Sequence, residues 1–125
     1  MLHEELTQKI IGCAMKVHST LGPGYLESVY QNALAHELRK NGIECELKTP
    51  LEVFYDDVLV GRFETDMLVE KVVMIENKAT QSISPAHEVQ LVNYLTATRT
   101  DVGLVLNFGA ASLQLKRNHR EYKKN

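Results

Sequence analysis

This 125-residue sequence contains no tryptophan, two cysteines and three prolines. Cys13 and Cys45 lack the CxxC spacing of zinc and redox motifs, which predicts small buried thiols in a reducing cytoplasm rather than a disulfide framework. No apolar run approaches the roughly 20 residues of a membrane-spanning helix, and residues 1–7 are polar and acidic, unlike a secretory signal. We therefore expect a cytoplasmic protein without a membrane partner.

The sequence also lacks a net positive charge, because its fourteen basic residues are outnumbered by sixteen acidic ones and the formal net charge is −2. This balance does not support a generally basic nucleic-acid binder. The sequence lacks the glycine-rich nucleotide-binding motifs and the G-x-S-x-G nucleophile motif, and neither Ser28 nor Ser82 has an indicated histidine partner. The length predicts a single domain over residues 1–125, and the apolar share of 44% is that of a globular fold.

Apolar residues at helical spacing predict three helices. The first covers residues 4–21 and ends at Gly22-Pro23-Gly24, where glycine and proline stop a helix. The second covers residues 26–40 and ends at Asn41-Gly42. The third covers residues 85–98, with Pro85 in its first turn.

From residue 43 the apolar period changes to two, which predicts strands. The predicted strands cover residues 43–48, 51–55, 58–69, 72–75, 102–108 and, at an edge, 113–117. A helix between the two buried strands 72–75 and 102–108 predicts a right-handed crossover that joins parallel strands. The fold class is therefore α/β or α+β, a mixed central sheet flanked by helices, followed by a polar, basic tail over residues 118–125.

Glu76 and Lys78 are the most distinctive polar residues, since they end an otherwise apolar strand. Residues two apart in a strand share a face, so the carboxylate and the ammonium project together. Charges beside a core strand are costly unless they are paired or functional. An isolated E-x-K pattern is short and common, and taken alone it is better explained by a salt bridge at a strand end.

Asp66 lies ten residues before Glu76, in the strand that precedes it. In a hairpin the two carboxylates share a face only if the loop near Glu70 to Val72 has an odd length or a bulge. With that register they would offer oxygen ligands suited to Mg²⁺ or Mn²⁺. A two-residue turn would instead separate them, and Asp66 would then only cap or solvate its strand.

Further polar residues share helix faces. Gln90 and Tyr94 are four apart on the third predicted helix, and His87 joins their face, which is also the pattern of a solvated surface. Glu27 begins the second helix, where the helix dipole by itself favours a carboxylate. His18 precedes the Gly22-Pro23-Gly24 loop and is most simply a hydrogen-bonded core residue.

Taken in order, Glu27, Asp66, Glu76-Asn77-Lys78 and Gln90 resemble the PD-(D/E)XK nuclease superfamily, in its exonuclease-like branch with a Q-x-x-x-Y helix. Residues 17–30, VHSTLGPGYLESVY, are similar to the signature of the GxxExxY protein family. Further landmarks of that family also occur in order: DMLV at 66–69, ENKA at 76–79, HEVQLVNYL at 87–95 and GLVLNFG at 103–109. The resemblance covers residues 18–117, nearly the whole chain.

The resemblance implies a restriction-endonuclease-like core with a metal site. It implies that Asp66 and Glu76 bind Mg²⁺ or Mn²⁺, that the backbone carbonyl of Asn77 completes the shell, and that Lys78 lies beside them. It further implies that Glu27 adds a ligand or binds a metal-held water. Gln90 and Tyr94 are then expected to position these groups.

The resulting hypothesis is a metal-dependent nuclease that hydrolyses phosphodiester bonds, with DNA favoured over RNA as substrate. Lys116 and Arg117, with the tail residues Arg120, Lys123 and Lys124, are candidates for phosphate contacts, although a solvated basic tail explains them equally well. The alternative is a nucleic-acid-binding or protein-binding module, or an accessory subunit, that keeps the fold without catalysis. A homodimer or a protein partner is expected to extend a footprint that one small domain cannot supply.

Overall fold

The computed structural model describes residues 2–121. Its elements follow one another as α1 (Glu4–Leu21), α2 (Glu27–Lys40), β1 (Cys45–Tyr55), β2 (Val58–Val69), β3 (Val73–Lys78), α3 (Pro85–Thr98), β4 (Val102–Asn107) and β5 (Gln114–His119). The three helices fall where the apolar periodicity predicts them, and α2 starts one residue later than predicted. Within residues 2–121, no helix combines the length and apolar content that crossing a membrane requires.

The five strands form one mixed sheet in sequence order, β1-β2-β3-β4-β5. Neighbouring strands are antiparallel except β3 and β4, which are parallel, as the crossover through α3 predicts. Strand β5 runs to His119, so the first part of the predicted basic tail is the end of an edge strand. Lys123 and Lys124 lie outside the described residues.

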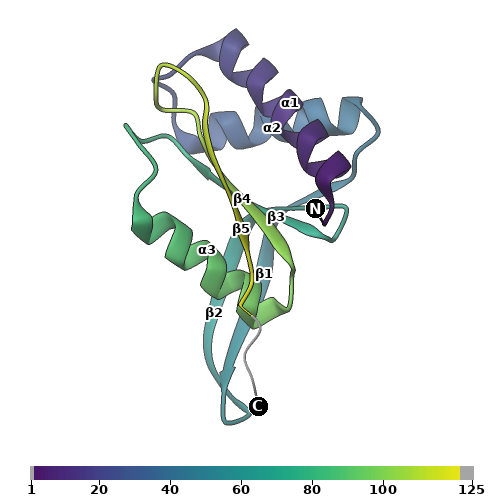
Figure 1. Cartoon of the computed structure of the whole chain (residues 1–125), viewed down its shortest axis with the longest axis vertical. Helices are drawn as coiled ribbons and strands as arrows, with labels where there is room; N and C mark the ends of the chain where they lie inside the picture. The colour runs from purple at the N-terminus through teal and green to yellow at the C-terminus, as the bar shows by residue number, and fades with distance from the viewer. Residues whose placement is uncertain (1, 122–125) are drawn as a thin grey trace.

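Helices cover both faces of this sheet (Figure 1). Because side chains alternate along a strand, Val73 and Ile75 of β3 face α1 and α2, whereas Met74 faces α3. The larger core lies on the α1/α2 face, and the smaller core on the α3 face contains Leu51, Met74, Leu91, Leu95 and Val105. The mixed sheet flanked by helices is therefore confirmed.

Tyr30 and Phe108 fix the start of α2 against the end of β4. Their rings stack with centroids 4.8 Å apart, and both side chains are fully buried. The Tyr30 hydroxyl donates a hydrogen bond of 2.6 Å to the Gly22 carbonyl, and Gly22 has a φ of 70°, which glycine adopts without steric cost. The loop before α2 is thus held over the carboxyl end of the parallel strands.

Strands β1 and β2 extend well beyond β3 as a two-stranded arm, residues 49–65, which projects from the sheet (Figure 1). The sequence predicts two strands in the region of β1, but Pro50 is tolerated at the sheet edge and the strand continues through it. The arm carries several exposed apolar side chains: Phe54, Tyr55, Val58, Leu59, Val60 and Phe63.

The arm also twists where it leaves the sheet. Leu47 packs with the α1/α2 core, whereas Leu51, four residues later, packs with the α3 core. Lys48 lies between them and has a φ of 53° in the left-handed region, which is uncommon outside glycine. This twist lays Leu51 and Phe63, at the base of the arm, against α3.

Candidate active site

The turn between β2 and β3 decides how the two acidic residues meet. Val69 pairs with Val73, so three residues form the turn, and Glu70 and Lys71 adopt left-handed φ values of 50° and 60°. The same register pairs Met67 with Ile75 and places Asp66 opposite Glu76 at the next position. Residues at opposite positions share a face. Of the two registers left open by the sequence, the structure has the one that brings the carboxylates together.

Glu76 is buried, with 5% of its surface exposed. Its Oε1 accepts a 2.8 Å hydrogen bond from the hydroxyl of Thr65, which is itself fully buried. Burial, together with the charge of Asp66, raises the pKa of Glu76 to about 7, against the opposing effects of Thr65, the Asp66 backbone and Lys78. A carboxylate held in this state gains strongly from a nearby cation.

Asp66 is half-buried, and its Oδ2 accepts a 2.8 Å hydrogen bond from the backbone N–H of Asn77. In an extended strand the N–H and C=O of one residue point to the same side, so the Asn77 carbonyl is directed toward β2 as well. The next carbonyl, that of Lys78, points the other way and accepts from Phe108 N–H at 2.8 Å. The Asn77 carbonyl is therefore on the Asp66 side of β3.

Lys78 and Tyr94 complete the surroundings of the two carboxylates. Lys78 is half-buried and shares the face of Glu76; within residues 2–121 no ion pair joins these two side chains, so the salt-bridge explanation is not observed. Tyr94 is half-buried on α3, and its pKa is raised by burial and by the charges of Glu76 and Asp66. Its ring lies 5.4 Å from that of Phe63 on the arm. Helix α3 thus brings a hydroxyl close to the acidic pair.

Other residues named by the sequence lie elsewhere. Glu27 is exposed at the first residue of α2, and Gln90 is exposed one turn before Tyr94. In the described part of the chain, no three His, Cys, Asp or Glu side chains are grouped as a metal site. His87 belongs to the capping box of α3, where its Nδ1 accepts from Ser84 N–H at 3.2 Å.

The two basic residues of β5 point to different layers. The Arg117 guanidinium donates to Thr7 Oγ1 at 2.6 Å and to the Leu2 carbonyl, so it ties β5 to the start of α1. Lys116 is exposed and lies opposite Val105, whose side chain packs under α3. Arg120 pairs with Asp101 at 2.7 Å. Of the candidate phosphate-binding residues within residues 2–121, only Lys116 has an exposed side chain on the α3 side.

The donor set fits a small divalent cation. Mg²⁺ and Mn²⁺ prefer hard oxygen ligands and are held by one or two carboxylates, with carbonyls and waters completing the shell. Asp66, Glu76 and the Asn77 carbonyl meet that description, and burial together with the charge of Asp66 raises the pKa of Glu76, so a bound cation would favour its ionised form.

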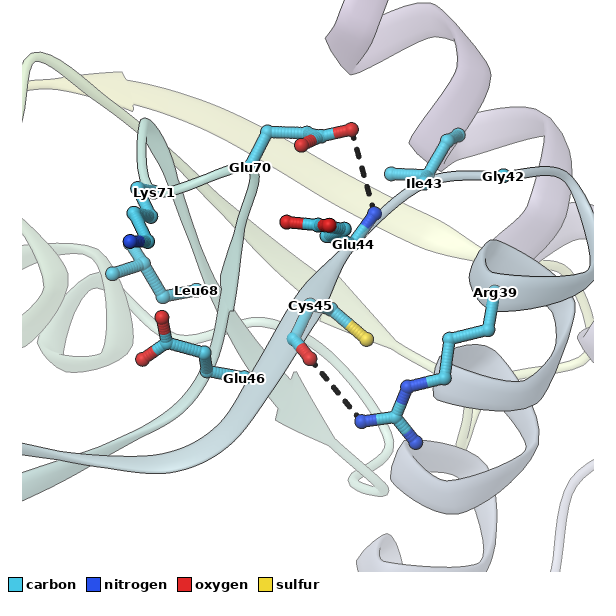
Figure 2. A pocket seen from close by; sticks show the side chains of 9 residues that line it. All are labelled: Arg39, Gly42, Ile43, Glu44, Cys45, Glu46, Leu68, Glu70 and Lys71. Carbon is cyan, nitrogen blue, oxygen red and sulfur yellow. Dashed lines mark hydrogen bonds between the residues drawn. The ribbon is translucent and has the colours of Figure 1, made fainter.

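Sequence reasoning missed Thr65, whose hydroxyl holds Glu76 from a strand position that ideal alternation assigns to the opposite face. A cavity of about 380 Å³ also carries none of the predicted residues. It lies at the β2–β3 turn, the other end of β3 from Lys78, where Arg39 donates to the Cys45 carbonyl and Glu70 accepts from Glu44 N–H (Figure 2). This cavity is therefore separate from the acidic site.

Comparison with known proteins identifies a family. The family model of the PD-(D/E)XK nuclease superfamily matches residues 4–119. The chain belongs to this superfamily, whose nucleases generally use divalent metals. The narrower resemblance to the GxxExxY family stays a prediction.

Among solved structures, the crystal structure of SSO0001 is similar, with a TM-score of 0.60 and 17% sequence identity. The likeness covers 97% of this chain but 61% of that one, and at this identity it concerns the fold alone. No curated protein matches the chain.

Proposed function

We propose that the protein is a metal-dependent nuclease that hydrolyses phosphodiester bonds, with DNA favoured over RNA. The observation that carries this proposal is the convergence of Asp66, Glu76 and Lys78 on one face at the end of β3. Membership of a nuclease superfamily supports the reaction class.

Asp66, Glu76 and the Asn77 carbonyl would hold Mg²⁺ or Mn²⁺, and Glu27 would contribute a further ligand or bind a metal-held water. When bound, the cation supplies a water of lowered pKa and polarises the phosphate. Thr65 keeps Glu76 Oε1 in place, and the Asn77 N–H keeps Asp66 Oδ2 in place, so both carboxylates are oriented before the substrate arrives.

Lys78 would stabilise the negative charge that develops on the nonbridging oxygens of the phosphate. Its position two residues after Glu76, on the same face, supports this role. Tyr94 and Gln90 would position the phosphate and its water from α3, and the charges of Glu76 and Asp66 act on the Tyr94 hydroxyl. Lys116 is the candidate for a more distant phosphate contact, and a second copy or a protein partner would extend the footprint.

Calorimetric titration with Mn²⁺ tests the metal site directly. We expect one site in the wild-type protein that is lost in Asp66→Asn and in Glu76→Gln, because each variant removes a charged oxygen ligand. Glu70→Gln is the matched control, since Glu70 lies in the β2–β3 turn, at the other end of β3. Loss of binding in Glu70→Gln, or binding retained in Asp66→Asn, would contradict the proposed site.

Cleavage of labelled single-stranded, duplex and branched DNA, with RNA as a parallel substrate, tests the activity. Mg²⁺-dependent cleavage that disappears in Asp66→Asn is the expected outcome. If the protein binds Mn²⁺ and nucleic acid but cleaves none of these substrates, the non-catalytic module is the better description.

A further inference from the structure

The register of β1 on β2 places Lys48 beside the acidic pair. Leu47 pairs with Met67 and Thr49 with Thr65, so Lys48 lies opposite Asp66. Asp66 in turn lies opposite Glu76 on β3. By the register of the flanking pairs, the backbone of Lys48 is level with that of Asp66 and Glu76 on three successive strands, which lie about 4.8 Å apart, and the left-handed backbone of Lys48 interrupts the regular ladder at this point.

The side chain of Lys48 is exposed to solvent. Within residues 2–121 its ammonium has neither an ion pair nor a hydrogen-bond partner, unlike Arg117 and Arg120, which are held inside the fold. A lysine ammonium on a flexible stem is a suitable point charge for a phosphate oxygen.

The same row continues in the other direction to Val105 on β4 and Lys116 on β5. Val105 is fully buried against Leu91 and Leu95, so α3 lies over the sheet between Glu76 and Lys116. On the β1 side of Glu76, by contrast, Asp66 is half-buried and Lys48 exposed. Lys48 is thus exposed on the edge strand beside the acidic pair, whereas buried side chains under α3 separate the pair from Lys116.

We propose that Lys48 binds a substrate phosphate adjacent to the one that is cleaved, on the β1 side of the Asp66–Glu76 pair. The inference rests on the proposed function, because it assumes that a polynucleotide enters this site. Lys48 and Lys78 then flank the two carboxylates, and with a divalent cation bound the local charge is positive although the whole chain carries −2. Affinity for a polyanion can therefore come from this short row rather than from a generally basic surface.

Lys48→Asn tests the proposal, with Lys71→Asn as the matched control. Both lysines have positive φ values, 53° and 60°, which asparagine tolerates, and Lys71 lies in the turn at the far end of β3. Binding of labelled single-stranded and duplex DNA is measured with Ca²⁺ in place of Mg²⁺ over a range of salt concentrations. We expect Lys48→Asn to weaken binding about 3- to 10-fold and to reduce the salt slope by roughly one, whereas Lys71→Asn changes neither. Lys48→Arg should retain both.

The outcomes separate this inference from the function on which it rests. If the wild-type protein cleaves DNA and Lys48→Asn binds it as Lys71→Asn does, Lys48 is not a phosphate-binding residue and the proposed function stands. Equal weakening in both variants, with unchanged melting temperatures, would assign the effect to overall charge and overturn the inference too. If the wild-type protein neither binds nor cleaves nucleic acid, the proposed function itself fails.

Discussion

On the face of β3 covered by α1 and α2 the side chains are Val73, Ile75 and Asn77, whereas on the α3 face they are Met74, Glu76 and Lys78. The first face packs into the larger core. The second begins in the smaller core at Met74 and ends in charged groups. One strand therefore anchors the fold on one side and presents ionisable groups on the other. Substitutions on the α1/α2 face should therefore reduce stability, whereas substitutions of the charged residues on the α3 face should impair metal binding or cleavage.

The largest expected effect concerns the α1/α2 face. Phe108→Ala removes a fully buried ring that stacks on Tyr30, and we expect it to lower the free energy of unfolding by about 3–5 kcal/mol. Urea denaturation measures this, with the exposed Val89→Ala as a control that should change by less than about 0.5 kcal/mol. Mn²⁺ affinity of the protein that remains folded should be unchanged; a specific loss of metal binding would mean that the faces are not separable.

Lys78→Met on the α3 face should leave the fold intact and impair the reaction. We expect cleavage to slow by about 10²- to 10³-fold, the usual cost of removing one group that stabilises developing charge. The unfolding midpoint should hardly move, because Lys78 makes no ion pair with Glu76. Single-turnover kinetics against Lys71→Met as control measure the difference, and equal rates in the two variants would remove Lys78 from the mechanism.

The pH dependence of stability should separate Glu76 from the apolar residues around it. Because burial and Asp66 raise the pKa of Glu76 to about 7, the folded protein holds a proton there that the unfolded chain has already lost. Stability therefore falls as the pH rises from about 4.5 through about 7, by about 3 kcal/mol in total.

Denaturation in EDTA at pH 5 and pH 8 measures this effect, and Glu76→Gln should lose most of the dependence. Saturating Mg²⁺ should restore stability to the wild-type protein at pH 8, since it binds the ionised carboxylate of the folded state. An identical pH profile in Glu76→Gln and the wild type would show that another group is responsible.

Of the four expected effects, that of Thr65→Val should be the smallest. It removes the hydroxyl that donates to Glu76 Oε1 while keeping the shape of the side chain. We expect Mn²⁺ binding to weaken by about 5- to 30-fold, or about 1–2 kcal/mol. Thr65→Ser keeps the donor and should bind Mn²⁺ nearly as the wild type does. If Thr65→Ser binds Mn²⁺ as weakly as Thr65→Val, the hydroxyl alone does not account for the role of Thr65.

The sequence predicted the helices and the parallel pairing of β3 and β4 because helical periodicity, Pro85 and the two buried strands act locally. It left the meeting of Asp66 and Glu76 open, since the register depends on whether the turn after Val69 takes two or three residues. That choice is made by the left-handed backbone of Glu70 and Lys71, which neither residue type requires.

The basic residues show a second limit. Lys116 and Arg117 are adjacent in sequence, but alternation sends one to the α3 side and the other to α1. Lys48 gave no signal in the sequence, because its position depends on the pairing of β1 with β2 rather than on its neighbours. The sequence therefore shows where basic residues lie along the chain but not which part of the folded surface they occupy.

The three-residue turn between β2 and β3 also limits how this chain can change in length. Side chains alternate with a period of two, so deleting or inserting a single residue there would turn the β2 acid to the opposite side from Glu76 without removing any ligand. Two inserted residues would preserve the pairing. Insertions or deletions of an even number of residues in this turn should therefore be tolerated better than those of an odd number. A random insertion library would reveal this pattern.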